Sequence, residues 1–218
     1  MSSAKSEEKK LSGYFNEPIA KEIISEPNSI EAFDRGIKER KFEVYYQPKV
    51  DIDTNTIVGC EGLARWDTEA GGLLEPAKFI HIFEENGIIE KFVLYILEEI
   101  CKTLDTLIKN GFRAVPVSFN VSRVDFRDIL LSKKIISIVE KYKIPLYLIH
   151  IELTELRYFE NPKFTINTIK ELKNFGIEIE MDNFGKGYTS LNMLSSLPLD
   201  FLKIDISYFR GDDNLYNS

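Results

Sequence analysis

Acidic and amide side chains recur in this sequence where short apolar segments end. The residues at these ends are Glu61, Asn120, Glu152, Asp182 and Asn183, and Lys203 closes the last such segment. Carboxylate and amide oxygens are hard ligands of the kind that Mg²⁺ or Mn²⁺ binds. Two such ions can activate a water molecule and neutralise the charge of a phosphoryl group. These residue types therefore indicate metal-assisted phosphate chemistry, provided that the fold brings the segment ends together.

The apolar segments have the length and composition of β-strands. Strands are expected over residues 42–46, 57–63, 115–121, 146–153, 177–181 and 201–204. The first two are separated by polar turn residues around Asp53, which predicts a hairpin. Between the later strands, apolar residues recur at helical spacing. These periodic stretches run from Phe92 to Ile108, from Ile129 to Tyr142 and from Ile166 to Phe175, and further helices are expected from Ser29 and over residues 189–196.

Strands that alternate with helices predict a mainly parallel sheet. In a β/α barrel the carboxyl ends of the strands surround the active site. A closed barrel has about eight strands, and this sequence provides about six. The segment after Lys203 is too short for two more β/α units. The pattern therefore predicts an incomplete barrel or an open sheet.

Composition limits the classes of function. The 218 residues carry a net charge of −7, which argues against a nucleic acid polymer as partner. A phosphodiester ligand stays compatible with this charge, because bound metal ions supply positive charge. Residues 1–28 are polar and are expected to form a tail or linker, and residues 29–218 are expected to form one domain.

The sequence has no apolar core of a signal peptide and no membrane segment of ~20 apolar residues. We therefore expect a cytoplasmic protein. Cys60 and Cys101 lie in apolar segments, match no metal-binding spacing and are expected to be buried thiols in a reducing compartment.

Six short motifs occur in a fixed order along the chain. They are Tyr45–Pro48, Glu61–Trp66, Phe119–Ser122, Glu152–Glu155, Met181–Leu191 and Leu202–Asp205. This ordered set resembles the EAL-domain family, the cyclic-di-GMP phosphodiesterases of bacteria, over roughly residues 30 to 210. The resemblance implies an α/β fold, a TIM-like β/α barrel that lacks its C-terminal part here. It also implies metal-dependent hydrolysis of cyclic-di-GMP to linear pGpG.

The resemblance implies roles for individual residues. Those that match the family's metal ligands are Glu61, Asn120, Glu152, Asp182 and Asn183. Those that match other catalytic or substrate-binding residues are Gln47, Arg65, Glu155 and Lys203. Gln47 and Arg65 would contact the dinucleotide, and Lys203 would hold phosphate or the attacking water. Glu155 would steady the loop over residues 183–190.

Three departures from the family pattern bear on activity. Gly62 replaces an alanine, which is a benign change because both residues are small. Asn183 replaces an aspartate, so the second metal ion should bind weakly. The chain also lacks the family's later catalytic glutamate and a glutamine. We therefore predict one dominant metal ion and very slow or no turnover. The alternatives are a catalytically degenerate cyclic-di-GMP-binding module and a protein-interaction module.

Two further expectations concern partners and interior residues. Unpaired sheet edges predict a homo-oligomer. The family resemblance implies, as an alternative, an attached sensory or GGDEF-type domain in a longer protein. His81 and His150 are expected to be structural, because no acid-base partner is evident for either. Glu178 and Glu180 lie four and two positions before Asp182, so on an ideal strand all three side chains point to the same side. They either face the barrel interior, with Glu180 pairing with Lys203, or face solvent on an irregular strand.

Overall fold

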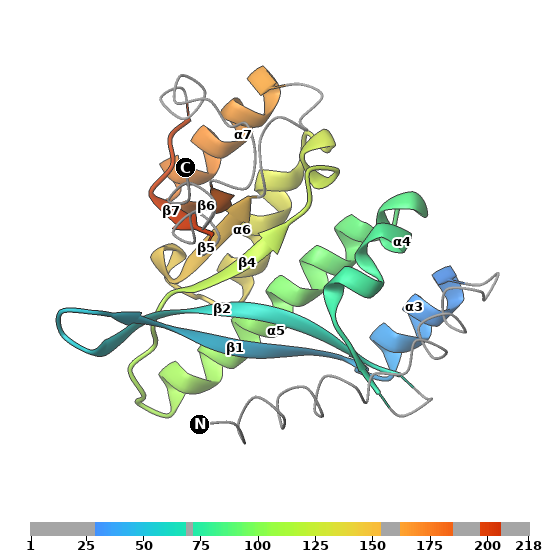
Figure 1. Ribbon diagram of the computed structural model, residues 1–218, viewed down its shortest axis with the longest axis horizontal. Coiled ribbons are helices and arrows are strands. Elements are labelled where there is room, and N and C mark those ends of the chain that lie inside the picture. Colours follow the sequence, from blue (N-terminus) through green and yellow to red (C-terminus); the bar gives the residue numbers. More distant parts are fainter. Residues whose placement is uncertain (1–28, 69–71, 154–161, 185–196, 206–218) are drawn as a thin grey trace, which may run out of the picture. The chain divides into compact units, whose positions relative to one another are not determined.

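The computed structural model describes residues 29–68, 72–153, 162–184 and 197–205 (Figure 1). The tail expected over residues 1–28 and the helix expected over residues 189–196 lie outside this part. The chain divides into two compact units. The smaller unit takes residues up to Glu43 and Ala64–Ile88, and the larger takes Val44–Leu63 and Ile89 onward.

A seven-stranded sheet runs through the described residues, and its strands follow the order β1-β2-β4-β5-β6-β7, with β3 paired to β2. The strands are β1 (Phe42–Asp51), β2 (Thr56–Asp67), β3 (Leu73–Leu74), β4 (Val117–Val121), β5 (Ile149–Leu153), β6 (Glu178–Phe184) and β7 (Phe201–Ile204). From β2 to β7 along this path, each pair of neighbours is parallel. The expected incomplete α/β barrel is confirmed, with all six expected strands present and the short β3 in addition.

The β1–β2 hairpin is closed by a turn that the side chain of Asp51 stabilises. Asp51 Oδ1 accepts hydrogen bonds from the backbone N–H groups of Asp53 and Thr54, at 3.1 and 2.7 Å. It also accepts one from Thr54 Oγ1 at 2.7 Å. A short polar side chain that binds the backbone in this way favours a turn over a continued strand. The predicted hairpin is therefore confirmed.

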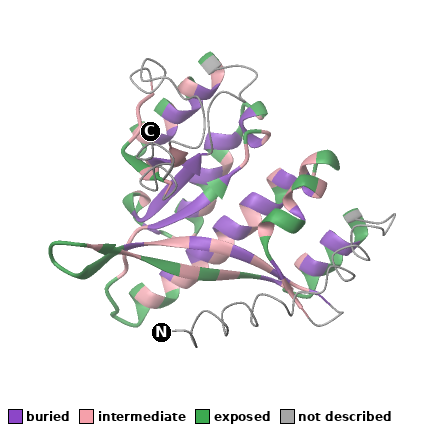
Figure 2. Cartoon of the chain, in the orientation of Figure 1, coloured by how far each residue is buried: buried purple, intermediate pink, exposed green. Residues whose placement is uncertain are grey.

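The larger unit packs three helices along one face of the sheet. They are α5 (Ile89–Lys109), α6 (Leu131–Lys141) and α7 (Pro162–Asn174). Helix α5 contacts β4 and α7 contacts β6, while α6 packs between α5 and α7. The strand residues that form this apolar layer, shown in purple in Figure 2, are Val117, Phe119, Val121, Ile149, Ile151, Leu153, Ile179 and Met181. Side chains alternate across a strand, so the residues between them point to the other face, the barrel interior.

Several expected boundaries were wrong, and β4, for example, begins at Val117 instead of residue 115. Residues Leu146–Leu148 form a 3-10 helix, and the strand expected there begins only at Ile149. Helix α6 begins at Leu131 instead of Ile129, because Asp128 Oδ1 accepts a hydrogen bond from the Leu130 N–H at 3.0 Å and holds a turn there. Phe175 lies beyond the end of α7 and is half-exposed, so it does not belong to the buried face of that helix.

The smaller unit has an aromatic core. Its helices are α3 (Ser29–Lys38), which was expected, and α4 (Ile80–Glu85), which was not. The buried rings are Phe33, Phe42, Trp66, Phe79 and Phe83. Their neighbouring centroids lie 5.0–6.2 Å apart, within the range of favourable tilted and edge-to-face pairs. The start of β1 and the end of β2 are held by this core.

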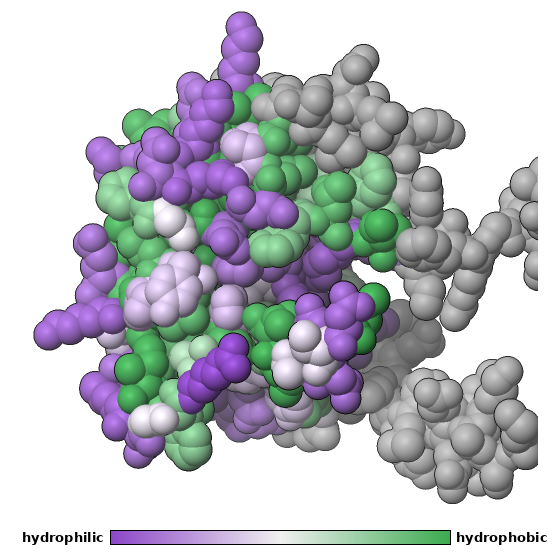
Figure 3. Space-filling view, turned by 90° about the vertical axis from the view of Figure 1, so that its left-hand side faces the viewer, coloured by the Kyte–Doolittle hydropathy of each residue, from purple (hydrophilic) through white to green (hydrophobic). Residues whose placement is uncertain are grey.

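The surface near the hairpin is mixed in polarity. Figure 3 shows hydrophilic and hydrophobic side chains interspersed on the face at the hairpin side of the molecule. Exposed apolar residues of the hairpin include Val50, Ile52, Ile57 and Val58. None of the helices in the described part of the chain has the length and apolar character needed to cross a membrane.

Candidate functional site

The polar residues expected at strand ends lie on neighbouring strands of the larger unit. Glu61 is on β2, Asn120 on β4, Glu152 on β5, Asp182 on β6 and Lys203 on β7. In the parallel register, Asn120 of β4 lies beside Glu152 of β5. Glu152 in turn lies beside Glu180 of β6. The side chains therefore share the interior face at the carboxyl end of the sheet.

Lys203 is the centre of this group. Its Nζ lies 2.7 Å from Glu61 Oε2, 2.7 Å from Glu152 Oε2 and 3.5 Å from Asp182 Oδ1. Asn120 Nδ2 donates a weaker hydrogen bond to Glu61 Oε1 at 3.3 Å. Three carboxylates from three strands thus gather around a single cationic atom.

Burial and charge act in opposite directions at this centre. Burial raises the pKa of Glu152 above its ordinary value, although the hydrogen bonds from Lys203 and Ser118 lower it. Burial lowers the pKa of Lys203, but its hydrogen bonds to Glu152 and Glu61 outweigh this effect and raise the pKa. Lys203 therefore stays protonated and neutralises part of the negative charge of the cluster.

Asp182 and Asn183 lie on an irregular part of β6. The pairing of β6 with β7 shifts register between Met181 and Phe184, and Asn183 adopts a left-handed backbone conformation with φ of 56°. Asparagine tolerates this conformation better than most residues. Asn183 Nδ2 donates a hydrogen bond to Asp182 Oδ2 at 2.6 Å. The irregularity changes the direction in which the side chains at the end of β6 point, as β-bulges beside active sites do.

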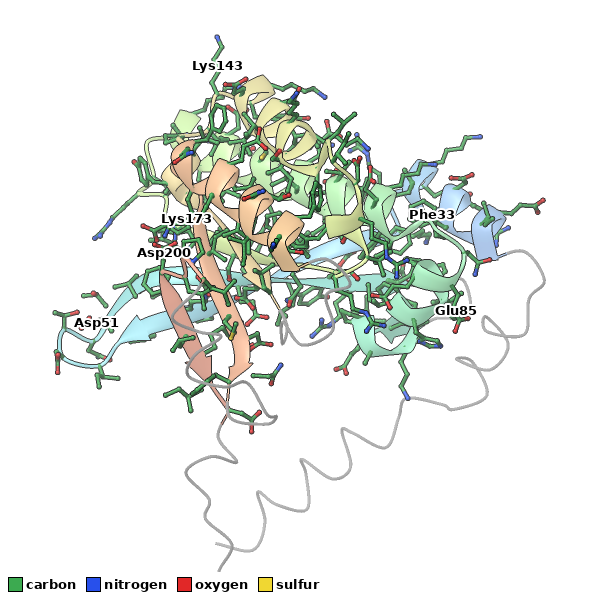
Figure 4. All side chains as sticks on the ribbon, turned by 90° about the horizontal axis from the view of Figure 1, so that it is seen from above. Phe33, Asp51, Glu85, Lys143, Lys173 and Asp200 are labelled. Carbon is green, nitrogen blue, oxygen red and sulfur yellow. The ribbon has the colours of Figure 1, made fainter. Side chains whose placement is uncertain are left out.

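Strand β7 is held in place by Asp200, which precedes it. Asp200 Oδ1 accepts a hydrogen bond from Lys173 Nζ of α7 at 2.5 Å, and the two side chains lie side by side in Figure 4. Asp200 Oδ2 accepts a second one from the Ile179 N–H of β6 at 2.9 Å. These contacts from two elements position the strand that carries Lys203.

The expected substrate-binding residues are divided between the units. Gln47 lines a pocket of about 420 Å³ in the larger unit, together with Glu61 and Lys203. Arg65 belongs to the smaller unit, where its guanidinium donates a hydrogen bond to the Ala64 carbonyl at 2.8 Å. Glu155 lies outside the described residues. Gln47 therefore lies in one unit with the acidic cluster and shares a pocket with two of its members, Glu61 and Lys203.

Gly62, the departure expected to be benign, lies where neighbouring atoms approach closely. A Cβ at this position would lie 3.1 Å from Ile100 Cδ1 and 3.3 Å from the Ser118 carbonyl oxygen. An alanine would therefore require Ile100 to shift by a few tenths of an ångström. The glycine relieves this contact beside Glu61.

A second polar layer lies beside the acidic cluster, and sequence reasoning found only part of it. Glu180 is buried and pairs with Lys49 Nζ and with His150 Nδ1, the latter at 2.9 Å. The expected pairing of Glu180 with Lys203 was wrong, because Lys49 reaches it from β1. His150 Nε2 also lies 3.1 Å from Glu178, so His150 does have acidic partners. No signal in the sequence singled out Lys49 or Ser118, since their roles depend on contacts between strands.

Glu180 is strongly acidic in this layer. Burial alone would raise the pKa of Glu180, but the hydrogen bonds from His150 and Lys49 outweigh it and lower the pKa to about 2. Glu180 and Lys49 are therefore a charged pair in the barrel interior, next to Glu152.

The chemistry of the acidic cluster fits a hard divalent cation. Its donors are carboxylate and amide oxygens, which Mg²⁺ and Mn²⁺ prefer. They already surround one positive charge, the Lys203 ammonium. Among the described residues, no three histidine, cysteine, aspartate or glutamate side chains form a ready-made metal site. An ion at this position would therefore require the ammonium of Lys203 to move aside.

Comparisons with known proteins identify relatives of this chain. A model of the EAL domain matches residues 30–218. The chain is 28% identical over 185 residues to the cyclic di-GMP phosphodiesterase RocR of Pseudomonas aeruginosa, covering 85% of this chain and 47% of that protein. It is 30% identical over 208 residues to the signaling protein YkoW of Bacillus subtilis, covering 95% of this chain and 26% of that protein. The chain thus spans half or less of the length of these curated relatives.

A solved structure has the same fold. The structure of the PaMucR phosphodiesterase in complex with c-di-GMP matches with a TM-score of 0.77 and 26% identity. The match covers 85% of this chain and 76% of that one. The matched family model extends over nearly all of the described residues, including every residue of the acidic cluster. The chain therefore belongs to the EAL-domain family.

Proposed function

We propose that this chain binds cyclic-di-GMP at the carboxyl end of its sheet and hydrolyses it to linear pGpG very slowly or not at all. The observation that carries the proposal is the convergence of Glu61, Glu152 and Asp182 on Lys203. The named activity of the relative RocR and the ligand named in the PaMucR structure support the choice of ligand.

The residues have distinct roles in this proposal. Glu61, Asn120, Glu152 and Asp182 would hold Mg²⁺ or Mn²⁺. A bound divalent cation supplies positive charge for the phosphoryl oxygens and activates water. Lys203 would donate hydrogen bonds to a phosphate oxygen of the ligand. The family resemblance implies that Gln47 and Arg65 would contact the dinucleotide and that Glu155 would steady the loop over residues 183–190.

Slow turnover follows from the metal ligands. Asn183 offers an amide oxygen where the family has a carboxylate, and its Nδ2 is engaged with Asp182. A second ion at Asp182 and Asn183 would therefore bind weakly. Phosphodiester cleavage that depends on two ions would then be slow, because one of the two sites would be mostly empty. This observation also favours the second candidate function, a cyclic-di-GMP-binding module without turnover. An attached sensory or GGDEF-type domain would then read the bound state.

Two measurements test the proposal. Calorimetry with cyclic-di-GMP and Mn²⁺ should show binding to the wild-type chain and none to Glu61→Ala. The matched control Glu98→Ala, which removes a helix carboxylate paired with Lys141, should bind as the wild type does. Chromatography after incubation with Mn²⁺ should detect little or no linear product. Absence of binding by the wild type would refute the proposal, and rapid turnover would refute its slow-hydrolysis part.

A further inference from the structure

Glu152 is held from both of its carboxylate oxygens. Oε2 accepts a hydrogen bond from Lys203 Nζ at 2.7 Å, on the side of the acidic cluster. Oε1 accepts hydrogen bonds from Ser118 Oγ and, at 3.2 Å, from Lys49 Nζ. The side chains of Glu152 and Ser118 are fully buried, so water does not replace these donors. The orientation of the carboxylate is therefore set by three protein groups.

Ser118 has a defined role in this arrangement because a hydroxyl has one proton to donate. Lys49 Nζ lies 2.7 Å from Ser118 Oγ and can only donate to it. The Ser118 hydroxyl therefore accepts from Lys49 and donates to Glu152. A third contact, to the Cys60 carbonyl at 3.4 Å, is longer and weaker. Lys49 thus acts on Glu152 both directly and through Ser118.

Lys49 reaches this position by crossing a neighbouring strand. It lies on β1, whereas Ser118 and Glu152 lie on β4 and β5, and β2 lies between in the sheet order. The residue of β2 in its path is Gly59. A Cβ there would lie 3.7 Å from Lys49 Cδ and 3.3 Å from the Pro116 carbonyl oxygen. The lysine stem therefore passes Gly59 at an ordinary van der Waals distance, and the tighter contact of such a Cβ would be with the Pro116 carbonyl oxygen.

The far side of the ammonium is fixed by Glu180. This buried carboxylate pairs with Lys49 and also with His150 Nδ1, at 2.9 Å. The His150 ring stacks on Phe201 with centroids 5.6 Å apart and planes 14° apart. Each member of the layer is therefore held by another, and the Lys49 ammonium has little freedom to leave Glu152.

We propose that Ser118 and Lys49 are positioning residues that fix Glu152 so that its Oε2 faces the metal site. The inference rests on the proposed metal site, because orientation matters only if Glu152 is a ligand. Groups that orient metal ligands through hydrogen bonds typically change metal affinity by about 10–100-fold. A ligand carboxylate free to rotate must be ordered again each time an ion binds, and the affinity falls accordingly.

Ser118→Ala is the sharper test, because it removes the orienting hydroxyl without changing any charge. Mn²⁺ affinity, measured by calorimetry, should fall about tenfold or more. The matched control is Ser132→Ala. Ser132 is also a buried serine that donates to a glutamate, Glu171, at 2.8 Å, but it lies on helix α6. The control should leave Mn²⁺ affinity unchanged even if it lowers stability. Equal affinity in wild type and Ser118→Ala would overturn the proposal.

A second measurement needs no metal. In the presence of a chelator, urea unfolding is followed for Ser118→Ala, Glu152→Gln and the double variant. If the hydroxyl orients Glu152, the two effects on the unfolding equilibrium constant should be non-additive by about fivefold or more. Additive effects would overturn the proposal. A wild-type chain that binds no Mn²⁺ would refute the proposed metal site instead, and the unfolding cycle would still decide whether Ser118 holds Glu152.

Discussion

Lys203 Nζ donates a hydrogen bond to Glu61 Oε2 at 2.7 Å, although 142 positions separate the two residues in the chain. Glu61 lies on β2 and Lys203 on β7, the first and last members of the parallel path. The lysine therefore spans the interior of the incomplete barrel. It holds the carboxylates that the proposed metal ion would need, so such an ion would compete with the ammonium for them.

Titration with Mn²⁺ should reveal one dominant site per chain. In the proposed function, Glu61, Asn120, Glu152 and Asp182 would provide one set of ligands, whereas Asn183 would weaken a second metal site. We expect calorimetry to give a single binding event that Glu61→Ala abolishes, and Asn183→Asp to add a second event. Glu98→Ala serves as the control with a distant carboxylate. Two equal, tight sites in the wild type would contradict this assignment.

Replacing Lys203 by methionine should have opposite effects on metal affinity and stability. Without metal, Glu152 would be buried with one donor fewer, so the free energy of unfolding should fall by about 3 kcal/mol. With metal, the competing charge is gone, and we expect Mn²⁺ to bind about tenfold more tightly. Calorimetry and urea unfolding with and without Mn²⁺ measure both effects. A parallel loss of affinity and stability would show that Lys203 supports the metal instead of competing with it.

Strand order and the acidic cluster were predictable from sequence because both depend on local patterns. Each ligand follows its own apolar strand, and parallel strands place their ends together. The charge network around Lys49 was not predictable in this way. Lys49 lies on the first strand of the hairpin and reaches Glu180, 131 residues later, across the three strands that separate β1 from β6 in the sheet. Nothing near Lys49 in sequence indicates that contact. Glu180 lies two positions before Asp182, which correctly predicted that its side chain faces the interior. The identity of its partner could not be predicted from this spacing.

Removing Lys49 should destabilise the chain strongly. Lys49→Met leaves Glu180 and Glu152 buried without one of their charged donors, and loss of one partner from a buried pair costs about 3 kcal/mol or more. Urea unfolding measures the change. The control Lys109→Met removes an exposed i,i+4 pair with Asp105, which contributes only about 0.3–0.5 kcal/mol. Similar small effects for both variants would mean that the interior layer is better hydrated than its burial indicates.

The two cysteines should resist modification in the folded chain. Burial raises the pKa of Cys101 to about 12 and also raises that of Cys60. The thiolate is the reactive form, so little of it is present near pH 8. A thiol-specific chromogenic reagent should label Cys101 only after unfolding in urea, and half-buried Cys60 slowly in the native state. Cys101→Ala separates the two signals. Immediate native labelling of both thiols would contradict the predicted burial.

The stability contributed by Glu180 should disappear in acid. Its pKa is about 2 in the folded chain and 4.5 for an ordinary glutamate, so the unfolded chain takes up the proton first as the pH falls. The contribution is therefore fully present above about pH 4.5 and is lost as the pH falls toward 2. At about 1.4 kcal/mol per pKa unit, it amounts to about 3 kcal/mol. The difference in unfolding free energy between wild type and Glu180→Gln should be largest near pH 6 and shrink steadily below pH 4.5.

The matched control for this titration is Glu178→Gln. Glu178 lies on the same strand and also faces His150, but its side chain is 42% exposed. Exposed ion pairs contribute about 1 kcal/mol or less, so this variant should differ little from the wild type at any pH. If Glu180→Gln and Glu178→Gln give the same pH profile, the pairing of Glu180 with Lys49 does not stabilise its charged form. In that case the acid sensitivity of the chain must arise from other carboxylates.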